Sequence, residues 1–371
     1  MAMKKKIMSI FGTRPEAIKM APVVKELENR DEFESVVVIT AQQREMLDQV
    51  LEVFEIIPDY DLDIMQPNQT LSELTSRVLV KLDPILAKEQ PDVILVHGDT
   101  TTSFVASLGA FYHQISIGHV EAGLRTWDKY APFPEEMNRQ MTDCLSDLYF
   151  APTELSKKNL LTSNIEEEKI MVTGNTVVDA LSETTLHGFN HPVMKEMNPE
   201  SKKVLLTCHR RENFGEPMKQ IFTSVIEMVK KYKELEVIYP VHPNPNVKAQ
   251  ATEMFKNIER IHLVEPMDVI DFHNCMKESY FIMSDSGGIQ EEAPSLGKPV
   301  LVLREVTERP EGLQTGILKL VGTKAETILA AVDELMTNKE YYQSLTKQDN
   351  PYGDGQASKR IADALGDYLK K

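Results

Sequence analysis

The sequence has little cysteine and lacks a long apolar run. Its three cysteines, Cys144, Cys208 and Cys275, are widely spaced and odd in number. They support neither a disulfide framework nor a CxxC-type metal site, so we expect buried thiols. No apolar run approaches the roughly 18 residues that cross a bilayer. The N-terminal lysines lead directly into a strand-like segment rather than a signal-peptide core. We therefore expect a cytoplasmic protein.

Positive charge is also scarce. The formal net charge is −16 at pH 7, whereas nucleic acids and anionic membranes attract surfaces of the opposite sign, so we expect neither as a partner. The arginines are the exception, because seven of the 12 lie in short motif-like segments: Arg14, Arg125, Arg139, Arg210, Arg211, Arg304 and Arg309. Guanidinium groups gathered at loop ends of an acidic protein suggest a small ligand that bears phosphate.

Several nucleotide and metal motifs are missing. The sequence has no GxxxxGK[ST] segment, which argues against a P-loop nucleotide hydrolase. No GxGxxG follows the first predicted strand, where IFGTRPE carries one glycine, and this weakens a dinucleotide-cofactor interpretation. HxH and HExxH spacings do not occur either, so we expect no metal site.

The sequence does contain an alternation of short apolar runs with helical patterns. DVILVHG and ISIGHV are nearly continuous apolar runs of the kind that parallel sheets bury on both faces. The alternation restarts at Lys203, after an irregular polar stretch from Gly188 that we interpret as a linker or domain edge. Because 371 residues exceed what one core usually supports, we predict an α/β protein with two doubly wound Rossmann-like domains facing a cleft.

We place the first domain at residues 1–175 and the second at 176–355. The first domain should begin with a strand, a glycine turn and a helix, with Thr13 as the N-cap of that helix and Pro15 at its first position. The tail follows a turn cluster, NPYGDG, and its apolar residues recur on one helix face. We therefore expect a C-terminal helix over 356–371 to join the first domain.

Three polar clusters, HGDT, HVEAGLRT and PFPEEMNR, stand where strands end or a helix begins. They supply the carboxylates Asp99, Glu121 and Glu135, which suit proton transfer on an anionic substrate. Structural explanations remain open for two of them. Asp99 could cap the following helix, and Glu135 could lie in the first turn of a helix because the helix dipole stabilises an acidic side chain there. Glu121 has the weakest structural explanation.

Two further segments suggest phosphate binding. Arg14 begins a helix where backbone amides favour an anion, although it could equally be an exposed loop charge. In DSGGIQEEAPSLGKP, the two glycines after Ser286 could let backbone amides cradle a diphosphate, or the segment could be an ordinary cap and turn. Glu291 and Glu292 follow one turn into the helix, where a carboxylate could bind ribose hydroxyls.

Eight ordered segments together resemble the non-hydrolysing UDP-N-acetylglucosamine 2-epimerases of bacteria: GTRPEAIKMAP, VHGDT, GHVEAGLRT, PFPEEMNRQ, HRREN, DSGGIQEEAPSLGKPVLVLR, TERPEG and NPYGDGQAS. The resemblance implies a glycosyltransferase-B-type fold with the ligand in its cleft. It implies interconversion of UDP-N-acetylglucosamine and UDP-N-acetylmannosamine for cell-wall and capsule polysaccharides. The implied route eliminates UDP to 2-acetamidoglucal and adds it back, without a cofactor. A homodimer is also implied.

The resemblance assigns roles residue by residue. Asp99, Glu121 and Glu135 match the acid/base carboxylates, and His209 matches a residue facing the departing diphosphate and sugar. The matches to substrate or UDP contacts are Arg14, Lys19, Arg139, Arg210, Met267, Phe272, Ser286, Gly287, Gly288, Glu292 and Arg309. A second, activating substrate site in some relatives would involve Gln42, Gln43, Glu136, Arg210 and His242. Gln43 and Asn68 depart from the histidine and arginine of relatives regulated in this way.

Three competing functions stay open. A glycosyltransferase of the same fold would bind the nucleotide sugar similarly but pass the sugar to an acceptor. A hydrolysing epimerase would release free N-acetylmannosamine and UDP. A non-catalytic nucleotide-sugar sensor is the third alternative, and the clustered titratable groups disfavour it.

Overall fold

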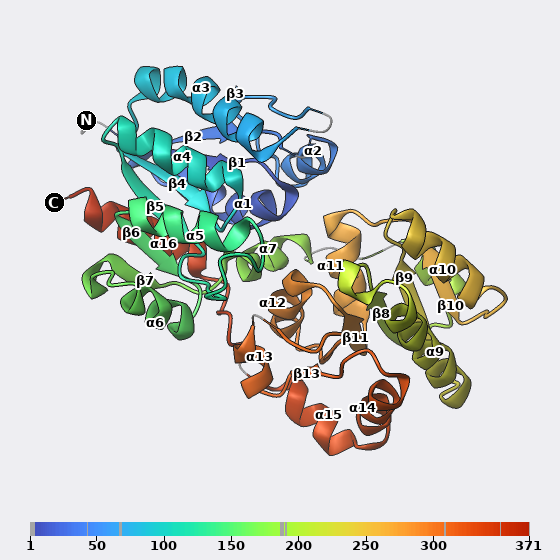
Figure 1. The fold of residues 1–371 in the computed structure, drawn as a ribbon. Helices are drawn as coiled ribbons and strands as arrows, with labels where there is room; N and C mark the ends of the chain where they lie inside the picture. The colour runs from blue at the N-terminus through green and yellow to red at the C-terminus, as the bar shows by residue number, and fades with distance from the viewer. Residues whose placement is uncertain are drawn as a thin grey trace. The chain divides into compact units, whose positions relative to one another are not determined.

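The computed structural model describes residues 4–42, 44–66, 69–185, 189, 191–307, 309–348 and 350–370. The chain divides into two compact units. Unit 1 comprises Met1–Ala180 and Tyr352–Lys371, and unit 2 comprises Leu181–Pro351. From the sequence we place the corresponding boundaries at 175 and 355. Unit 2 is thus one continuous segment, whereas unit 1 is built from both ends of the chain (Figure 1).

Unit 1 contains a parallel sheet in the order β3-β2-β1-β4-β5-β6-β7. The chain therefore winds outward from β1 in both directions, which confirms the predicted doubly wound sheet. The strands are β1 (Lys5–Phe11), β2 (Phe33–Ile39), β3 (Tyr60–Asp61), β4 (Val93–His97), β5 (Ser116–Val120), β6 (Leu148–Ala151) and β7 (Ile170–Val172).

Helices separate these strands in the sequence. They are α1 (Arg14–Glu28), α2 (Arg44–Val53), α3 (Leu71–Glu89), α4 (Thr101–Tyr112), α5 (Glu135–Leu145), α6 (Glu154–Thr162), the 3₁₀ helix η1 (Glu167–Lys169), α7 (Thr176–Thr184) and α16 (Ala357–Tyr368). The boundary between the units falls within α7. In Figure 1, α16 lies in red among the blue and green elements of unit 1, and it packs against α1.

The start of α1 follows from its sequence. Thr13 is the N-cap, and its side chain and that of Glu16 form a capping box that satisfies backbone amides of the first turn. The predicted cap is confirmed, but the helix begins at Arg14, so Pro15 is its second residue and not its first. Because the first-turn amides have no partner within the helix, proline is tolerated at either position.

Unit 2 repeats the winding with a parallel sheet in the order β10-β9-β8-β11-β12-β13. Its strands are β8 (Lys202–Thr207), β9 (Leu235–Pro240), β10 (Ile261–Val264), β11 (Phe281–Ser284), β12 (Val300–Val302) and β13 (Leu318–Leu320). Its helices are α8 (Pro192–Glu196), η2 (Arg211–Asn213, 3₁₀), α9 (Glu216–Lys231), α10 (Pro245–Phe255), α11 (Val269–Glu278), α12 (Gly287–Ser295), α13 (Pro310–Gln314), α14 (Ala325–Thr337) and α15 (Lys339–Thr346).

The polar stretch before β8 contains a short helix that the sequence interpretation missed. α8 spans only five residues, and the His191 side chain accepts a hydrogen bond from the amide of Val193 at its start. Val193 itself is buried in a core cluster of unit 2. The segment is therefore not irregular throughout, because one apolar contact and a proline in the first turn suffice for a single helical turn.

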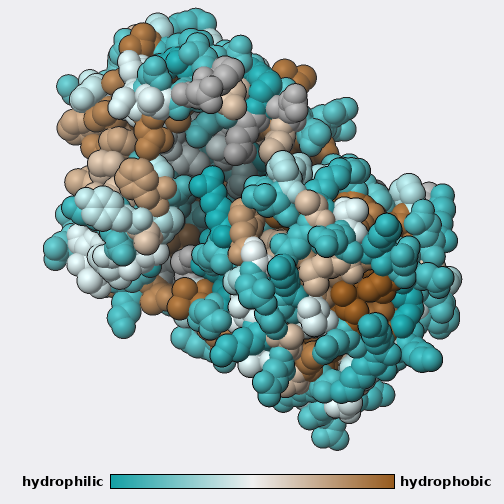
Figure 2. Space-filling view, turned by 45° about the vertical axis from the view of Figure 1, so that its right-hand side comes forward, coloured by the Kyte–Doolittle hydropathy of each residue, from teal (hydrophilic) through white to brown (hydrophobic). Residues whose placement is uncertain are grey.

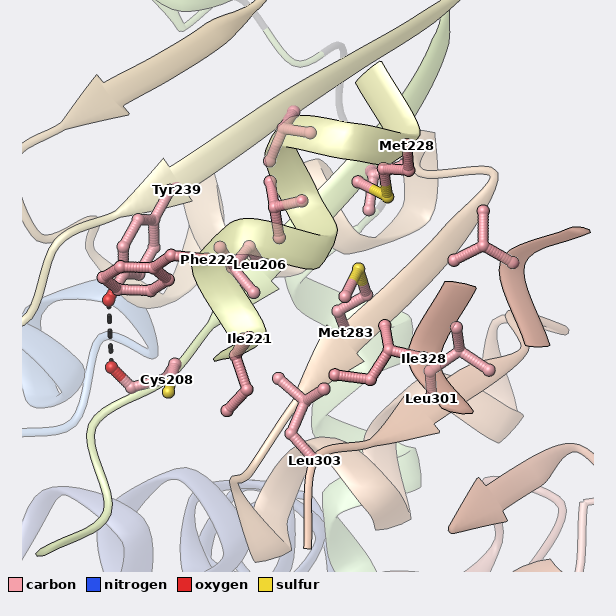
Figure 3. Packing of buried hydrophobic residues seen from close by; sticks show 14 of the residues in the cluster. Leu206, Cys208, Ile221, Phe222, Met228, Tyr239, Met283, Leu301, Leu303 and Ile328 are labelled. Atoms are coloured by element: carbon pink, nitrogen blue, oxygen red, sulfur yellow. Dashed lines mark hydrogen bonds between the residues drawn. The ribbon is translucent and has the colours of Figure 1, made fainter. Parts of the chain in front are cut away.

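The core of unit 2 packs the α9 face against the sheet (Figure 3). Leu206 of β8 and Met283 of β11 are fully buried, as are Ile221 and Phe222 of α9. The buried Tyr239 hydroxyl donates a hydrogen bond of 2.9 Å to the carbonyl oxygen of Cys208, which is drawn in Figure 3. This bond fixes the chain just beyond the end of β8, where predicted site residues begin.

The surface is mixed, and Figure 2 shows a face on which hydrophilic residues surround small hydrophobic patches. Among the described residues, no helix combines the length and apolarity needed to cross a membrane. All three cysteines are free thiols, and Cys208 and Cys275 are buried as expected. The expectation is wrong for Cys144, which is exposed on α5 next to the buried Asp143. Consecutive helical residues point about 100° apart, so neighbours can differ in burial.

Candidate active site

In both units some of the predicted site residues follow the strands between which the winding of the sheet reverses. The reversal lies between β1 and β4 in unit 1, and between β8 and β11 in unit 2. Arg14 follows β1 and Asp99 follows β4, while His209 follows β8 and Ser286 follows β11. Open α/β sheets bind ligands outside the carboxyl ends of strands at such reversals.

Glu121 directly follows β5 and has the left-handed backbone conformation, with φ of +64°. A residue other than glycine seldom adopts this conformation, and such residues cluster at functional sites. The side chain is only 9% exposed and forms an ion pair with Lys19. Asn175 Nδ2 donates a hydrogen bond of 2.9 Å to Glu121 Oε2. An ammonium and an amide donor both suit a charged carboxylate, so Glu121 is held in one position as an anion.

His97 is the last residue of β4. It belongs to the HGDT motif, but the sequence predicts no role for it. Its ring is buried, with Nε2 3.7 Å from Glu121 Oε2. Burial lowers the pKa of His97 to about 4, although the Glu121 carboxylate acts in the opposite direction. His97 is therefore a neutral imidazole beside a charged pair at neutral pH. The signal in the sequence was its position two residues before Asp99.

Asp99 forms an ion pair with Arg139 of α5, and Asn138 Nδ2 donates a hydrogen bond of 3.1 Å to the Asp99 carbonyl oxygen. The alternative in which Asp99 caps the next helix is wrong. The N-cap of α4 is Thr100, whose side chain accepts from the amide of Ser103 at 3.1 Å. Asp99 is thus free of capping and keeps a partly exposed carboxylate.

Glu135 and Glu136 are adjacent in α5 but differ in environment. Glu136 is fully buried, and its carboxylate accepts from the amides of Thr126 and Trp127 at 3.0 and 3.2 Å. It therefore anchors the loop that follows β5. Glu135 is half-buried, and within the described residues its Oε2 atom is shielded from solvent without a hydrogen-bond donor. Of the two, Glu135 has the oxygen still available for a ligand.

Arg125 does not behave as a loop-end phosphate ligand. Its guanidinium is only 1% exposed and lies 2.5 Å from Asp143 Oδ2 of α5. Arg139 is similarly buried but pairs with the partly exposed Asp99. The suggestion that the arginines in these motifs bind a phosphate-bearing ligand is thus wrong for Arg125. Nothing in the local sequence separates these two residues, because Asp143 and Asp99, the partners that distinguish them, come from other elements.

Further predicted residues of unit 1 lie in α1 and before α2. Arg14 is half-buried at the first position of α1, and Lys19 is on the same helix. Gln42 Oε1 accepts a hydrogen bond of 3.2 Å from the Thr102 hydroxyl of α4. Gln43 and Asn68 lie outside the described residues.

In unit 2, the fully buried Asp285 organises the turn after β8. Its Oδ2 atom accepts from the amides of His209 and Arg210 at 2.9 and 2.8 Å and from Asn213 Nδ2 at 2.9 Å. Arg210 Nε donates to the Asp285 carbonyl oxygen at 3.0 Å. Sequence reasoning missed this role, although the DSGG motif begins with the residue. One carboxylate thus fixes the backbone that presents His209.

The ring of His209 stacks on that of His242, with ring centroids 5.0 Å apart and planes at 9°. His209 Nδ1 lies 3.6 Å from Asp285 Oδ1. Partial burial lowers the pKa of His209, and the Asp285 carboxylate acts in the opposite direction. His242 is exposed, and its Nδ1 accepts from the amide of Asn244 at 3.1 Å.

The segment after β11 begins α12 at Gly287. Ser286 is the N-cap of α12, but its side chain makes no cap hydrogen bond. A Cβ atom added at Gly287 would lie 2.8 Å from an Arg309 guanidinium nitrogen, so the guanidinium lies against this turn. Arg309 Nε donates to Glu291 Oε1 at 2.7 Å. First-turn amides and a guanidinium at one helix end suit an anion.

The remaining predicted residues lie around α11 and α12. Glu292 Oε2 is 3.9 Å from His273 Nε2, and Gly288 faces Glu292. Met267 is buried in a core cluster, and Phe272 packs against it. Among the described residues, no group of three or more His, Cys, Asp or Glu side chains could hold a metal ion.

Two Rossmann-like domains with polar switch points define an α/β protein of the glycosyltransferase-B type. The sequence pattern of the family described as UDP-N-acetylglucosamine 2-epimerase matches residues 25–366. The UDP-N-acetylglucosamine 2-epimerase of Bacillus subtilis is 56% identical over 362 residues, which cover 98% of this chain and 95% of that protein. The chain belongs to the UDP-N-acetylglucosamine 2-epimerase family, whose enzymes are isomerases.

Solved structures agree with this assignment. The UDP-N-acetylglucosamine 2-epimerase of Neisseria meningitidis, bound to UDP-N-acetylglucosamine, has a TM-score of 0.89 and 49% identity, with coverage of 99% of this chain and 100% of that one. The enzyme of Methanocaldococcus jannaschii, in complex with UDP-N-acetylglucosamine and UDP, has a TM-score of 0.81 and 36% identity, with coverage of 97% and 99%.

Proposed function

We propose that the protein catalyses the reversible C2 epimerisation of UDP-N-acetylglucosamine to UDP-N-acetylmannosamine without net hydrolysis. The observation that carries this proposal is the carboxylate Glu121, held in a left-handed backbone conformation between Lys19 and Asn175. The names of the relatives and the nucleotide sugars bound in their structures support the substrate.

The proposed route is an elimination followed by an addition. A base removes the C2 proton, the electron pair of that C–H bond forms the C1=C2 double bond, and the C1–O bond electrons leave with UDP. The intermediate is 2-acetamidoglucal. Re-addition of UDP at C1 with protonation of C2 from the opposite face inverts that carbon. No electron is gained or lost overall, so the reaction needs no redox cofactor.

This route requires a base on one face of the sugar and an acid on the other. Asp99, Glu121 and Glu135 are the proposed acid/base groups. Glu121 and Asp99 are each matched to a buried cation, Lys19 and Arg139, which keeps them charged and oriented in the resting protein. Glu135 keeps a shielded oxygen within reach of a ligand.

We propose that unit 2 supplies most of the UDP contacts. Amides of the Ser286–Gly287–Gly288 turn and the Arg309 guanidinium would bind the diphosphate, and Glu292 would accept from ribose hydroxyls. Met267 and Phe272 would border uracil. His209 and Arg210, fixed by Asp285, would face the diphosphate as the C1–O bond breaks. From unit 1, Arg14, Lys19 and Arg139 would contact substrate.

The product would supply cell-wall or capsule polysaccharide synthesis, and the active form would be a homodimer. We further propose that substrate activates the enzyme at a second site near Gln42, Gln43, Glu136, Arg210 and His242. Progress curves with UDP-N-acetylmannosamine alone should then lag until UDP-N-acetylglucosamine is added. Linear progress from the first turnover would contradict activation.

The test of the main proposal is incubation with UDP-N-acetylglucosamine in D₂O, followed at C2 by NMR. Deuterium at C2 together with UDP-N-acetylmannosamine is the expected result. Release of free N-acetylmannosamine and UDP would identify a hydrolysing epimerase. Unchanged substrate in the absence of an acceptor would favour a glycosyltransferase or a nucleotide-sugar sensor.

A further inference from the structure

His119 lies in β5, two residues before Glu121, and its ring is fully buried. Its Nδ1 atom is 2.6 Å from Asp143 Oδ1, and its Nε2 atom is 2.7 Å from the Gly98 carbonyl oxygen. A carbonyl oxygen and an ionised carboxylate can only accept hydrogen bonds. Both ring nitrogens must therefore donate, which makes His119 a buried imidazolium.

The charges around the ring are consistent with this state. Arg125, from the loop after β5, lies 2.5 Å from the other oxygen of Asp143. Burial alone would raise the pKa of Asp143, but His119 and Arg125 outweigh it and lower that pKa. The other titratable neighbours are His97 of β4, which is neutral at physiological pH, and Tyr149 of β6, the register partner of His119.

The two hydrogen bonds of His119 join the elements that carry the proposed acid/base carboxylates. Gly98 immediately precedes Asp99 and has a φ of +65°, a turn that suits glycine, and its amide donates to the Val120 carbonyl oxygen at 2.9 Å. Asp143 is on α5, the helix that begins with Glu135. Asn138 and Arg139 of α5 bind Asp99 in turn.

These contacts form a closed ring of interactions. It runs from His119 to Asp143, along one turn of α5 to Arg139, from there to Asp99, and through Gly98 back to His119. Within the described part of the chain, His119 is the side chain that connects β5, the end of β4 and α5 at once. Its loss would remove the contacts of β5 with Gly98 and with Asp143 that are made by this ring.

We propose that His119, as a doubly protonated ring, is a positioning residue that sets the mutual geometry of Asp99, Glu121 and Glu135. It touches none of the reacting atoms and acts through Gly98 and Asp143. This inference rests on the proposed epimerisation, because the geometry matters only if the three carboxylates exchange protons with one substrate.

The first test replaces His119 by Phe, which removes both donors, and by Gln, which keeps one. We expect kcat to fall about 100-fold for His119→Phe and about tenfold for His119→Gln, since small displacements of reacting groups cost this much. KM and the Kd for UDP should stay within about threefold of wild type. All rates are expressed per folded molecule, determined by circular dichroism and thermal unfolding.

The matched control is His113→Gln. His113 also pairs with an aspartate through one ring nitrogen, with Nε2 2.8 Å from Asp83 Oδ1, but it caps the far end of α4. This variant should leave kcat unchanged. A merely structural role of His119 would lower the folded fraction while kcat per folded molecule stayed within threefold, and that result would overturn the proposal. A rise in KM without loss of kcat would also overturn it.

The second test needs no activity. In ¹⁵N-histidine-labelled wild type, the His119 ring, assigned by its loss in His119→Gln, should show both nitrogens protonated at pH 7.5. Asp143→Asn should convert it to a neutral ring, since an amide can donate to Nδ1, and should reduce kcat less than His119→Phe does. One unprotonated nitrogen in wild type would refute the imidazolium. Absence of C2 exchange in wild type would instead refute the proposed function, and the NMR result would still stand.

Discussion

Unit 1 and unit 2 share a winding order but use their polar residues differently. In unit 1, charged side chains form ion pairs, as Lys19 does with Glu121 and Arg139 with Asp99. In unit 2, one buried carboxylate, Asp285, accepts from the backbone amides of His209 and Arg210, and α12 begins at Gly287 without a side-chain cap. Side-chain charge suits proton transfer, whereas an ordered backbone suits anion binding. The same sheet order would thus support the proposed chemistry in one unit and the proposed recognition in the other.

The strongest test of this division is Glu121→Gln. We expect deuterium exchange at C2 to fall about 1,000-fold, because a proton-transfer group contributes between about 10² and 10⁴ in rate. The Kd for UDP, measured by calorimetry, should change less than about twofold because the proposed UDP contacts lie mainly in unit 2. Glu154→Gln, at an exposed position of α6, serves as the control. Near-full exchange in Glu121→Gln would remove this residue from the acid/base set.

A second prediction concerns the acid stability of unit 1. The pKa of His97 is about 4 in the folded protein and about 6.5 when unfolded. The unfolded chain therefore binds more protons between these values, and stability present above pH 6.5 is lost as the pH falls toward 4. The loss should reach about 3 kcal/mol, since each pKa unit corresponds to about 1.4 kcal/mol.

His97→Gln should flatten this pH dependence. The single tryptophan, Trp127, belongs to unit 1, so its fluorescence during urea unfolding reports on this unit. His113→Gln should leave the slope between pH 7.5 and 5 as in wild type. An equally steep slope in His97→Gln would mean that other groups cause the acid sensitivity.

A third prediction addresses the recognition side. Arg309→Lys keeps a positive charge near Glu291 but loses the planar fork with which Arg309 would bind phosphate through two hydrogen bonds. UDP binding should weaken about tenfold, with kcat at saturating substrate nearly unchanged. Arg44→Lys removes the fork from an exposed cluster with Asp61 and Asp63, and UDP binding should not respond. An equal loss of kcat and affinity in Arg309→Lys would contradict the proposed separation of catalysis in unit 1 from UDP binding in unit 2.

The smallest expected effect is that of Gly287→Ala. The added Cβ would lie 2.8 Å from the Arg309 guanidinium, which must move aside. We expect UDP binding to weaken about fivefold, the cost of mild overpacking. In an Arg309→Lys background the same substitution should add little, because its effect passes through that side chain. Additive losses measured by calorimetry would show that the turn backbone itself is disturbed.

The sequence predicts both sheets because buried parallel strands form short apolar runs, and it predicts the Thr13 cap because capping depends on residues three apart. It does not separate Arg125 from Arg139, whose partners are Asp143 and Asp99. Asp99 and Arg139 are 40 residues apart, so their pairing follows from the packing of α5 and not from a local pattern. The roles of Asp285 and His119 depend on neighbouring strands in the same way. The motifs predict which residues form the site, and only the packing identifies the contacts that hold these residues.

The interrupted course of unit 1 affects how the protein folds during synthesis. Unit 2 is encoded as one stretch, so it can fold as soon as Pro351 has left the ribosome, whereas unit 1 waits for α16. Until then α1 lacks the apolar face of α16 formed by Ile361, Ala362 and Leu365, which is fully buried in the finished protein. Throughout the translation of unit 2, nascent unit 1 therefore lacks the helix that packs against α1 in the finished protein.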